Sequence, residues 1–542
     1  MLSYRKLAMR VLGRPLHTEG IDSPRPASQR AAALVLTAAM LTTLAAPAFA
    51  DIWHIENGDI TISAGESGNN VTQNNNTTYG DTNTIITNQN KDTASSHTVT
   101  IEAKDKDDKV EVTLKDVNID TSSRNKAAVS VTGEGDTNIK LDGDNALKSD
   151  IYRSGIYGSG SGSLTISGGE NDSLTAQGGS GANGISSSGS LTISGGTVTA
   201  NGDDGGRGIS SSGSVTISGG STVTANGGSS TISGGDGIWS GGGVTISGGS
   251  TVTANGGNGG SLVGGDGIRS GGGLTVSDGT VTAKGGNGDS KDGYGGDGIR
   301  SGGVVTISGN TVNAAGGYGG KVGGYGICSF DRVAISGGTV EAAGGNGSTG
   351  GGSGIYSSVI DLSGSLELTA KAGSPTGKAL LQNGRELDLD TIKDKLGPGA
   401  KVTATDANGE TKQVSIPRPV EPEEPVIPGE SSSSSDGGSA APSASVSSLP
   451  GLTVTDKDGQ RISYTSTQSG NTLTVCVGRL TASFRISLAA LRQLRAEGIE
   501  TIAFQTVLCS TTLSVDELLA MGGENAEAVL THRFTDSSLT VG

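Results

Sequence analysis

The sequence predicts a mainly β protein that consists of a parallel β-helix, a proline- and serine-rich linker and a small α+β domain. A Gly-Ile dipeptide recurs every 24 to 31 residues, apolar and polar residues alternate at fixed phase between the dipeptides, and glycine-rich corners separate these segments. Self-similarity at such a period is typical of a solenoid, in which each turn stacks on its neighbours. The isoleucines that mark the period are Ile156, Ile185, Ile209, Ile238, Ile268, Ile299, Ile327 and Ile355.

Within each repeat, apolar residues at every second position predict strands with one buried face. Equivalent positions of successive repeats predict four buried columns, and the threonines between them should form an outward ladder. A disordered glycine-rich tract is the alternative, but it does not require β-branched residues at fixed phase. Two columns run from Val198 to Val340 and from Ala200 to Ala342. The other two are Leu164, Leu191, Val215, Val244, Leu274, Val305 and Val333, and Ile166, Ile193, Ile217, Ile246, Val276, Ile307 and Ile335.

The composition narrows the class of protein. The 542 residues include 94 glycines, only 3% are aromatic, and the formal net charge is -16. These values describe an acidic, repeat-built chain rather than a large globular enzyme. No basic patch points to a nucleic-acid partner, whereas the acidity suits solubility and divalent cations.

Residues 1–50 have the pattern of a secretory signal peptide. Several arginines precede an apolar run that ends in Ala48-Phe49-Ala50, an Ala-x-Ala cleavage site before Asp51. No later apolar stretch is long enough to span a bilayer. We therefore expect an extracellular protein, either released or held at the cell surface without a covalent anchor.

After the leader, residues 51–96 are asparagine-rich and predict an irregular cap over the open end of the solenoid, with Trp53 and Ile55 in its core. Residues 97–416 form the predicted β-helix domain. Residues 417–450 are first rich in proline and glutamate and then in serine and glycine, which predicts a linker that is extended and then flexible.

Residues 451–542 predict the small α+β domain. Two strands flank a turn at 469–471, Ser487 is placed to cap a helix, and Ser514 with Glu517 forms a capping box for a second helix. We interpret this domain as an interaction or capping module whose candidate partner is another surface component. Its two cysteines, Cys476 and Cys509, either pair or lie as separate buried thiols.

One long run carries a family resemblance. The segment VEVTLKDVNIDTSSRNKAAVSVTGEGDTNIKLDGDNALKSD, followed by GIYGSGSGSLTISGG and GISSSGSLTISGGTVTA, resembles the carbohydrate-binding β-helix family of secreted clostridial proteins. The resemblance covers about residues 97–372. It implies a right-handed parallel β-helix, bound calcium and non-catalytic affinity for plant cell-wall polysaccharide.

Two sets of aspartates are candidate calcium ligands. Asp236, Asp266 and Asp297 occupy the same phase of three successive GGDGI motifs, and oxygen ligands on stacked turns suit a hard cation. Asp142 and Asp144 form the second set. The alternative for the first set is a ladder of charges that neutralise one another, because arginines follow two of the three aspartates by three residues.

No catalytic residue is predicted. An enzyme of this fold that acts on polysaccharides needs carboxylates with a cationic or histidine partner, and the repeats contain no histidine. The candidate acid pairs are Asp203 with Asp204 and Asp289 with Asp292. Acids in glycine-rich loops are usually solvated charges.

The strongest binding candidate is the residue after each marker isoleucine. These side chains should point outward as one stripe, and aromatic faces stack on sugars whereas arginine holds carboxylates. The alternative is that outward positions simply vary. The stripe residues are Tyr157, Ser186, Ser210, Trp239, Arg269, Arg300, Cys328 and Tyr356. The predicted ligand-binding residues are Trp239, Arg269, Arg300, Tyr356 and the loop residues Tyr294, Tyr318 and Tyr325.

These observations predict a secreted protein that binds an extracellular or cell-wall polysaccharide without cleaving it. The two arginines favour an acidic polymer. A structural adhesin or matrix spacer is the alternative function, and a polysaccharide lyase or hydrolase is the third.

Overall fold

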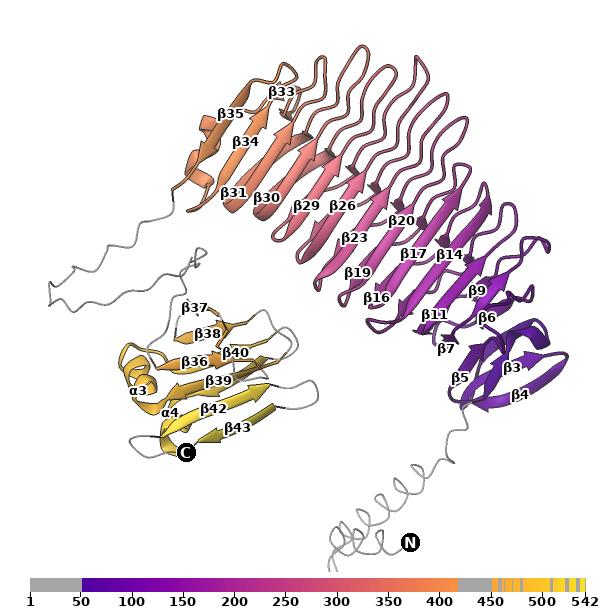
Figure 1. The fold of residues 1–542 in the computed structure, drawn as a ribbon, viewed down its shortest axis with the longest axis horizontal. Coiled ribbons are helices and arrows are strands. Elements are labelled where there is room, and N and C mark those ends of the chain that lie inside the picture. Colours follow the sequence, from indigo (N-terminus) through magenta and orange to yellow (C-terminus); the bar gives the residue numbers. More distant parts are fainter. Residues whose placement is uncertain are drawn as a thin grey trace, which may run out of the picture. The chain divides into compact units, whose positions relative to one another are not determined.

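The computed structural model describes residues 51–417 and, with short gaps, residues 451–541; the gaps are 457–460, 463, 470, 478–480, 507–509, 522–525 and 533–536 (Figure 1). The predicted leader, nearly all of the predicted linker and Cys509 lie outside the described residues. Contacts divide the chain into two compact units, which are described separately. No helix in the described part of the chain is long and apolar enough to cross a membrane.

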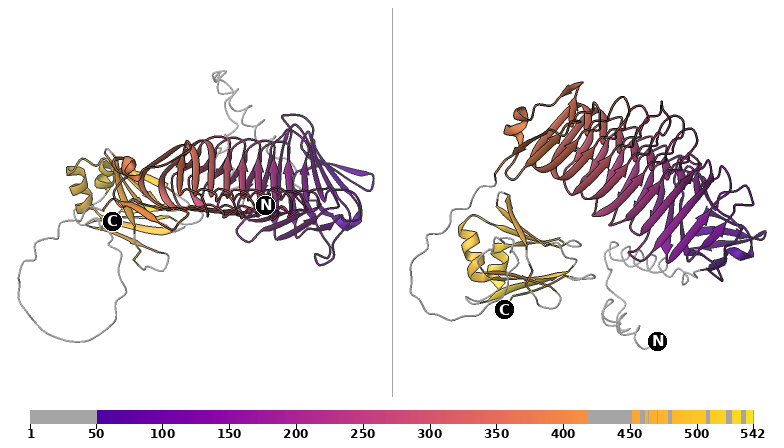
Figure 2. Two further views of the ribbon diagram at one scale, coloured as in Figure 1. Left: turned by 90° about the horizontal axis from the view of Figure 1, so that it is seen from above. Right: turned by 45° about the horizontal axis from the view of Figure 1, so that its top comes forward.

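The first unit is a parallel β-helix, as the sequence predicted. Each turn adds one strand to each of three parallel sheets, which we call the first, second and third sheets in chain order within a turn (Figures 1 and 2). The first sheet contains β2 (Ile60–Gly65), β6 (Val99–Ala103), β9 (Val129–Gly133), β12 (Ile156–Gly158), β15 (Ile185–Ser187), β18 (Ile209–Ser211), β21 (Ile238–Ser240), β24 (Ile268–Ser270), β27 (Ile299–Ser301) and β32 (Leu380–Gln382).

The other two sheets have the same stacked arrangement. The second contains β1 (Ile52–His54), β5 (Thr84–Thr87), β7 (Lys109–Lys115), β10 (Asp136–Asp142), β13 (Leu164–Ser167), β16 (Leu191–Ser194), β19 (Val215–Ser218), β22 (Val244–Ile246), β25 (Leu274–Val276) and β28 (Val305–Ile307). The third contains β8 (Asn118–Asp120), β11 (Asp144–Lys148), β14 (Ser173–Ser180), β17 (Thr197–Asp203), β20 (Thr222–Asn226), β23 (Ser250–Asn255), β26 (Gly279–Lys284), β29 (Thr311–Ala315) and β34 (Lys401–Thr405). Two long strands, β30 (Ile327–Ala343) and β31 (Ile355–Lys371), bend through all three sheets.

Strand pairing confirms the predicted columns. Ile217, Ile246 and Val276 are direct partners in the second sheet, and Thr216, Thr245 and Thr275 form the ladder beside them. The valine and alanine columns pair in the same register in the third sheet. The column side chains are almost completely buried and form one continuous core. Like residues therefore stack on like residues along the axis, with strands about 4.8 Å apart.

The N-terminal cap is more regular than the sequence predicted. It is built from strands, and β3 (Gly68–Gln73) and β4 (Asn76–Asp81) extend β2 as an antiparallel meander. The short 3-10 helix η1 (Ile55–Asn57) places Ile55 in the core, as expected. Trp53 is half-buried against that core, and its Nε1 donates a hydrogen bond of 3.0 Å to Oδ2 of Asp81.

The C-terminal end of the β-helix is also closed. The antiparallel strand β35 (Thr411–Ser415) covers the edge of β34, and the two-residue strand β33 (Arg385–Glu386) pairs with β32. The 3-10 helix η2 (Leu389–Lys395) buries Leu389 and Ile392 against the last turn. Both ends of the solenoid are thereby protected from further strand pairing.

Glycine-rich loops leave the third sheet and return to the first, and they stand side by side along one edge of the β-helix (Figures 1 and 2). Their two legs hydrogen-bond in a zigzag from turn to turn: the N–H of Gly257 donates to Gly235 (2.8 Å), that of Gly265 to Gly257 (2.8 Å), and that of Gly286 to Gly265 (2.8 Å). A β-carbon on Gly265 would lie 1.9 Å from the carbonyl oxygen of Gly235. Glycine is required here because the backbones approach so closely.

We therefore expect Gly265→Ala to separate adjacent loops and to destabilise the β-helix by about 1 to 3 kcal/mol, the usual cost of forcing extra volume into a packed site. Thermal unfolding followed by circular dichroism measures this loss. Gly309→Ala is the matched control, since its nearest neighbour would lie at an ordinary 3.4 Å. Equal melting temperatures for the two variants would contradict the close packing of the loops.

In its described residues, the second unit has two four-stranded sheets and two helices. One sheet contains β36 (Leu452–Thr455), β39 (Ala482–Ser487), β42 (Glu527–His532) and β43 (Ser537–Val541). The other contains β37 (Thr465–Ser469), β38 (Thr472–Cys476), β40 (Thr501–Gln505) and β41 (Ser510–Ser514). Helix α3 (Leu488–Ala496) begins at the predicted cap, where Oγ of Ser487 accepts the N–H of Ala490. Helix α4 (Val515–Met521) follows Ser514, whose Oγ accepts the N–H of Glu517 at 3.4 Å.

Candidate functional site

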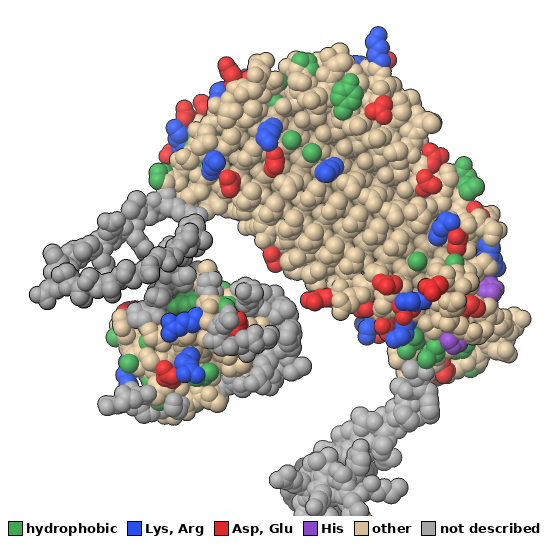
Figure 3. Space-filling model, in the orientation of Figure 1, with side chains coloured by type: hydrophobic (Ala, Val, Ile, Leu, Met, Phe, Trp, Pro, Cys, Tyr) green, Lys and Arg blue, Asp and Glu red, His purple; other side chains and the backbone are tan. Residues whose placement is uncertain are grey.

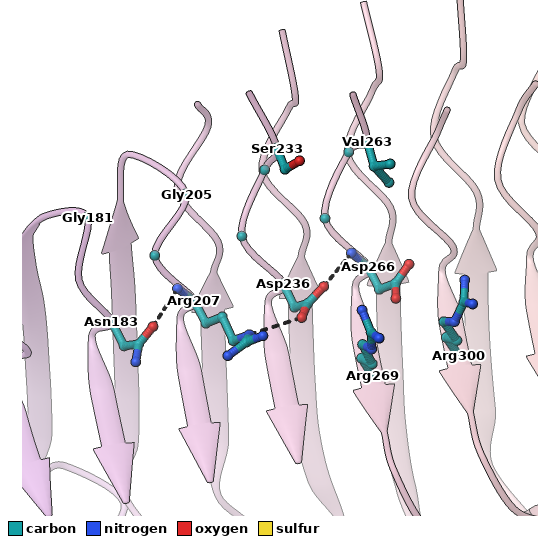
Figure 4. Close-up of a pocket in the computed structure, with 15 residues that line it drawn as sticks. Gly181, Asn183, Gly205, Arg207, Ser233, Asp236, Val263, Asp266, Arg269 and Arg300 are labelled. Atoms are coloured by element: carbon teal, nitrogen blue, oxygen red, sulfur yellow. Dashed lines mark hydrogen bonds and ion pairs between the residues drawn. The ribbon is translucent and has the colours of Figure 1, made fainter. Parts of the chain in front are cut away.

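A polar groove of about 490 Å³ crosses several turns where the glycine loops return to the first sheet (Figure 4). Backbone of the loop glycines forms much of its wall. The side chains that matter for its chemistry come from successive turns: Asn183, Arg207, Asp236, Asp266, Arg269 and Arg300. The β-helix thus brings together residues that are far apart in sequence, at a spacing of about 4.8 Å per turn.

The residues two positions before six of the marker isoleucines, Ile185 to Ile327, form a column beside this groove. We call it the corner column: Asn183, Arg207, Asp236, Asp266, Asp297 and Tyr325. Side-chain Oδ1 atoms in the column accept the backbone N–H of the next corner residue. The distances are 2.9 Å from the N–H of Asp266 to Asp236 and 2.7 Å from that of Asp297 to Asp266. An aspartate or asparagine at a corner therefore satisfies a backbone donor that the turn geometry leaves open.

The three stacked aspartates differ in their charged partners. Asp236 Oδ2 pairs with Nε of Arg207 at 3.1 Å, and Asp297 Oδ2 pairs with Nη1 of Arg300 at 3.3 Å. Asp266 lies between them and has no ion pair among the described residues. Of the two predicted Asp–Arg pairs, the structure therefore forms Asp297–Arg300. Arg269 does not pair with Asp266 in the described residues, and Asp236 pairs with Arg207 instead.

Burial and the neighbouring carboxylates of Asp297 and Asp236 raise the pKa of Asp266 to about 8. Burial also raises the pKa of Asp297, to about 6, against the opposing effects of the Tyr325 N–H and Arg300. Desolvation and like charges both disfavour ionisation of a carboxyl group. Folding therefore favours the protonated, uncharged form of Asp266.

Arg269 is the groove's available cation. Its side chain is exposed, lines the groove and forms no hydrogen bond or ion pair with the described residues (Figure 4). Its positive charge is one of the effects that oppose the rise in the pKa of Asp297. Since Arg207 and Arg300 are paired with aspartates, Arg269 is the arginine of the groove that has no ion pair among the described residues.

The predicted stripe is in register from Tyr157 to Tyr356. Two of its residues, Ser210 and Cys328, are buried rather than exposed. At two other stripe positions, a corner-column side chain lies over the stripe residue of the next turn. The guanidinium of Arg207 lies 4.4 Å from the centre of the Trp239 ring, and Tyr325 stacks on Tyr356 at 5.0 Å.

Burial raises the pKa of the Cys328 thiol to about 12, so this cysteine is an unreactive core group. The two remaining candidates lie on the loops, where 42% of Tyr294 and 46% of Tyr318 are exposed. Nζ of Lys321 lies 5.5 Å from the centre of the Tyr294 ring. The structure therefore places Arg269 and Arg300 in the groove, and the five predicted aromatic residues are not among its lining residues.

The candidate calcium ligands form a column rather than a cluster. Their oxygens face backbone N–H groups and arginines, as described above. In the second set, Asp142 pairs with Lys115 at 2.7 Å, and Asp144 accepts the hydroxyl of Ser173 at 2.7 Å. Within the described ranges, no group of three or more His, Cys, Asp or Glu side chains is arranged to hold a metal ion. Calcium binding stays a prediction.

Sequence reasoning missed Arg207 and Asn183 as parts of the groove. The signal was present, because GGRGI and ANGI occur at the phase of GGDGI. The four acids considered for catalysis are exposed: Asp203 is the last residue of β17, and the other three, Asp204, Asp289 and Asp292, lie in loops. Comparison with protein-family models, curated proteins and solved structures gives no significant match to this chain.

Proposed function

We propose that the protein binds an acidic extracellular polysaccharide along the groove and leaves it intact. The observation that carries the proposal is the exposed guanidinium of Arg269, which has no partner in the described part of the chain, in a groove that crosses successive turns. Such a group forms charge-assisted hydrogen bonds with a carboxylate or sulfate on a sugar. The polar backbone of the glycine loops offers further hydrogen-bonding groups for sugar hydroxyls.

The groove suits a polymer better than a compact ligand. Its lining residues follow the axis, so a linear chain would meet similar backbone groups on each turn, and only a few side chains carry charge. Much of the β-helix face in Figure 3 likewise consists of backbone and uncharged polar side chains. Each contact would contribute weakly, so affinity should rise with the length of the oligosaccharide. Added salt should lower the part of the affinity that depends on the charge of Arg269.

A glycan array probed with the full chain, in calcium and in a calcium chelator, tests this proposal. We expect binding to acidic polymers such as polygalacturonate over neutral glycans. No binding to any glycan would favour the alternative of a structural adhesin or spacer. Shortened or unsaturated products after incubation with polygalacturonate would instead indicate a lyase or hydrolase. Loss of binding in the chelator would support the calcium prediction.

A further inference from the structure

An exposed tyrosine outside the predicted site lies at the N-terminal end of the groove. Tyr152 precedes the corner at Asn183 by one turn, and its N–H donates to the carbonyl of Ser180 at 2.9 Å. A β-carbon placed on Gly181 would lie only 2.8 Å from Cε1 of Tyr152. The ring is therefore packed directly on Gly181, which lines the end of the groove (Figure 4).

Tyr152 is held in an unusual way for a surface residue. Although one side of its ring packs on Gly181, 78% of the residue is exposed. Its φ of 58° lies in the left-handed region, which is unfavourable for a bulky side chain. A strained backbone persists only where the surrounding structure holds it.

Hydrogen bonds around the turn supply that support. Oδ1 of Asp150 accepts the N–H of Ile151 at 2.7 Å, and the carbonyl of Asp150 accepts the N–H of Arg153 at 2.9 Å. Nε of Arg153 in turn donates to Oδ1 of Asn125 on the preceding turn at 3.2 Å. The ring is consequently displayed on an ordered turn, so little conformational freedom would be lost when a ligand covers it.

We propose that Tyr152 is an aromatic platform on which a sugar ring stacks at the end of the groove. This inference rests on the proposed binding of a polysaccharide and adds one turn to the site. The lining residues from Asn183 to Arg300 come from five turns, and Tyr152 supplies the sixth. Sugar rings present apolar faces, and the flat face of a tyrosine is suited to cover them.

The test compares Tyr152→Ala with Tyr79→Ala by titration of the full chain with oligogalacturonates of increasing length. Tyr79 on β4 is a matched control because it is 77% exposed but lies in the N-terminal cap. We expect Tyr152→Ala to weaken the binding of long oligomers by about threefold to tenfold, the range for an aromatic contact. Tyr152→Phe should bind like the unmodified protein, since the ring face and not the hydroxyl makes the contact.

The outcomes separate this inference from the proposed function. If the unmodified protein binds long oligomers and Tyr152→Ala binds them as tightly as Tyr79→Ala, the platform is refuted and the groove is not. If the unmodified protein binds no acidic oligomer, the proposed function fails first and the platform fails with it. A loss of binding in Tyr152→Phe equal to that in Tyr152→Ala would also overturn stacking as the mechanism.

Discussion

Replacing Ile246 with aspartate should unfold the turns around it. The Ile246 side chain is fully buried in the second sheet between Ile217 and Val276, and a carboxylate there would have neither water nor a charged partner. An uncompensated buried charge lowers the free energy of unfolding by on the order of 3 to 5 kcal/mol. In a solenoid each turn is stabilised mainly by its neighbours, so the damage should spread along the axis.

Thr245→Asp is the matched control for this experiment. Thr245 is the preceding residue on the same strand, but its side chain is exposed. Circular dichroism during heating should show a large fall in melting temperature, or no folded protein, for Ile246→Asp and little change for Thr245→Asp. A melting curve for Ile246→Asp like that of the unmodified protein would show that the register of the β-helix is wrong.

The second large effect is the pH dependence of stability that Asp266 causes. Asp266 is the corner-column aspartate without an ion pair among the described residues. A carboxyl group whose pKa is raised by folding binds its proton more tightly in the folded state, so the folded state loses stability as the pH rises between the two pKa values. For Asp266 this window runs from about 4, the model-peptide value, to about 8. Once the pH is above about 8, the free energy of unfolding has fallen by on the order of several kcal/mol.

Asp266→Asn should remove much of this pH dependence. Asparagine resembles the protonated acid, and its Oδ1 retains an acceptor for the N–H of Asp297. Melting temperatures of the variant and the unmodified protein should be similar near pH 4, and the variant should melt at a clearly higher temperature near pH 9. Asp289→Asn changes an exposed loop carboxylate and is the control. Parallel pH profiles for all three proteins would contradict the assignment of Asp266 as a buried neutral acid.

The core of the β-helix was predictable because single residue types repeat at single positions. Ile, Val and Ala columns need no long-range information, since a turn of nearly constant length places like residues in contact. The strands of the cap were harder to predict because polar side chains occupy some of their buried positions. Nδ2 of Asn69 donates to Oγ1 of Thr84, and Nε2 of Gln73 donates to the carbonyl of His54, so these residues are satisfied inside the cap. Their polarity conceals the alternation that marks a strand.

The groove was only partly predictable for a different reason. The repeat phase places Asp236, Asp266 and Asp297 in one column and Arg269 and Arg300 in the next. It does not state which side chains lean across from one column to the other. Arg207 covers one face of Trp239 and also neutralises Asp236, and both contacts depend on side-chain directions that emerge only when the turns are stacked.

The most direct test of acidic polysaccharide binding is calorimetric titration of the full chain with polygalacturonate at low and high salt. Arg269→Ala is the informative variant, because Arg300→Ala would also leave the buried Asp297 without its ion pair. Arg332→Ala removes an exposed arginine outside the groove and is the control. We expect Arg269→Ala to lower the affinity about tenfold or more, as for the loss of a charge-assisted hydrogen bond, and Arg332→Ala to have little effect. Binding that is equal in all three proteins and insensitive to salt, or no binding at all, would contradict the proposed site.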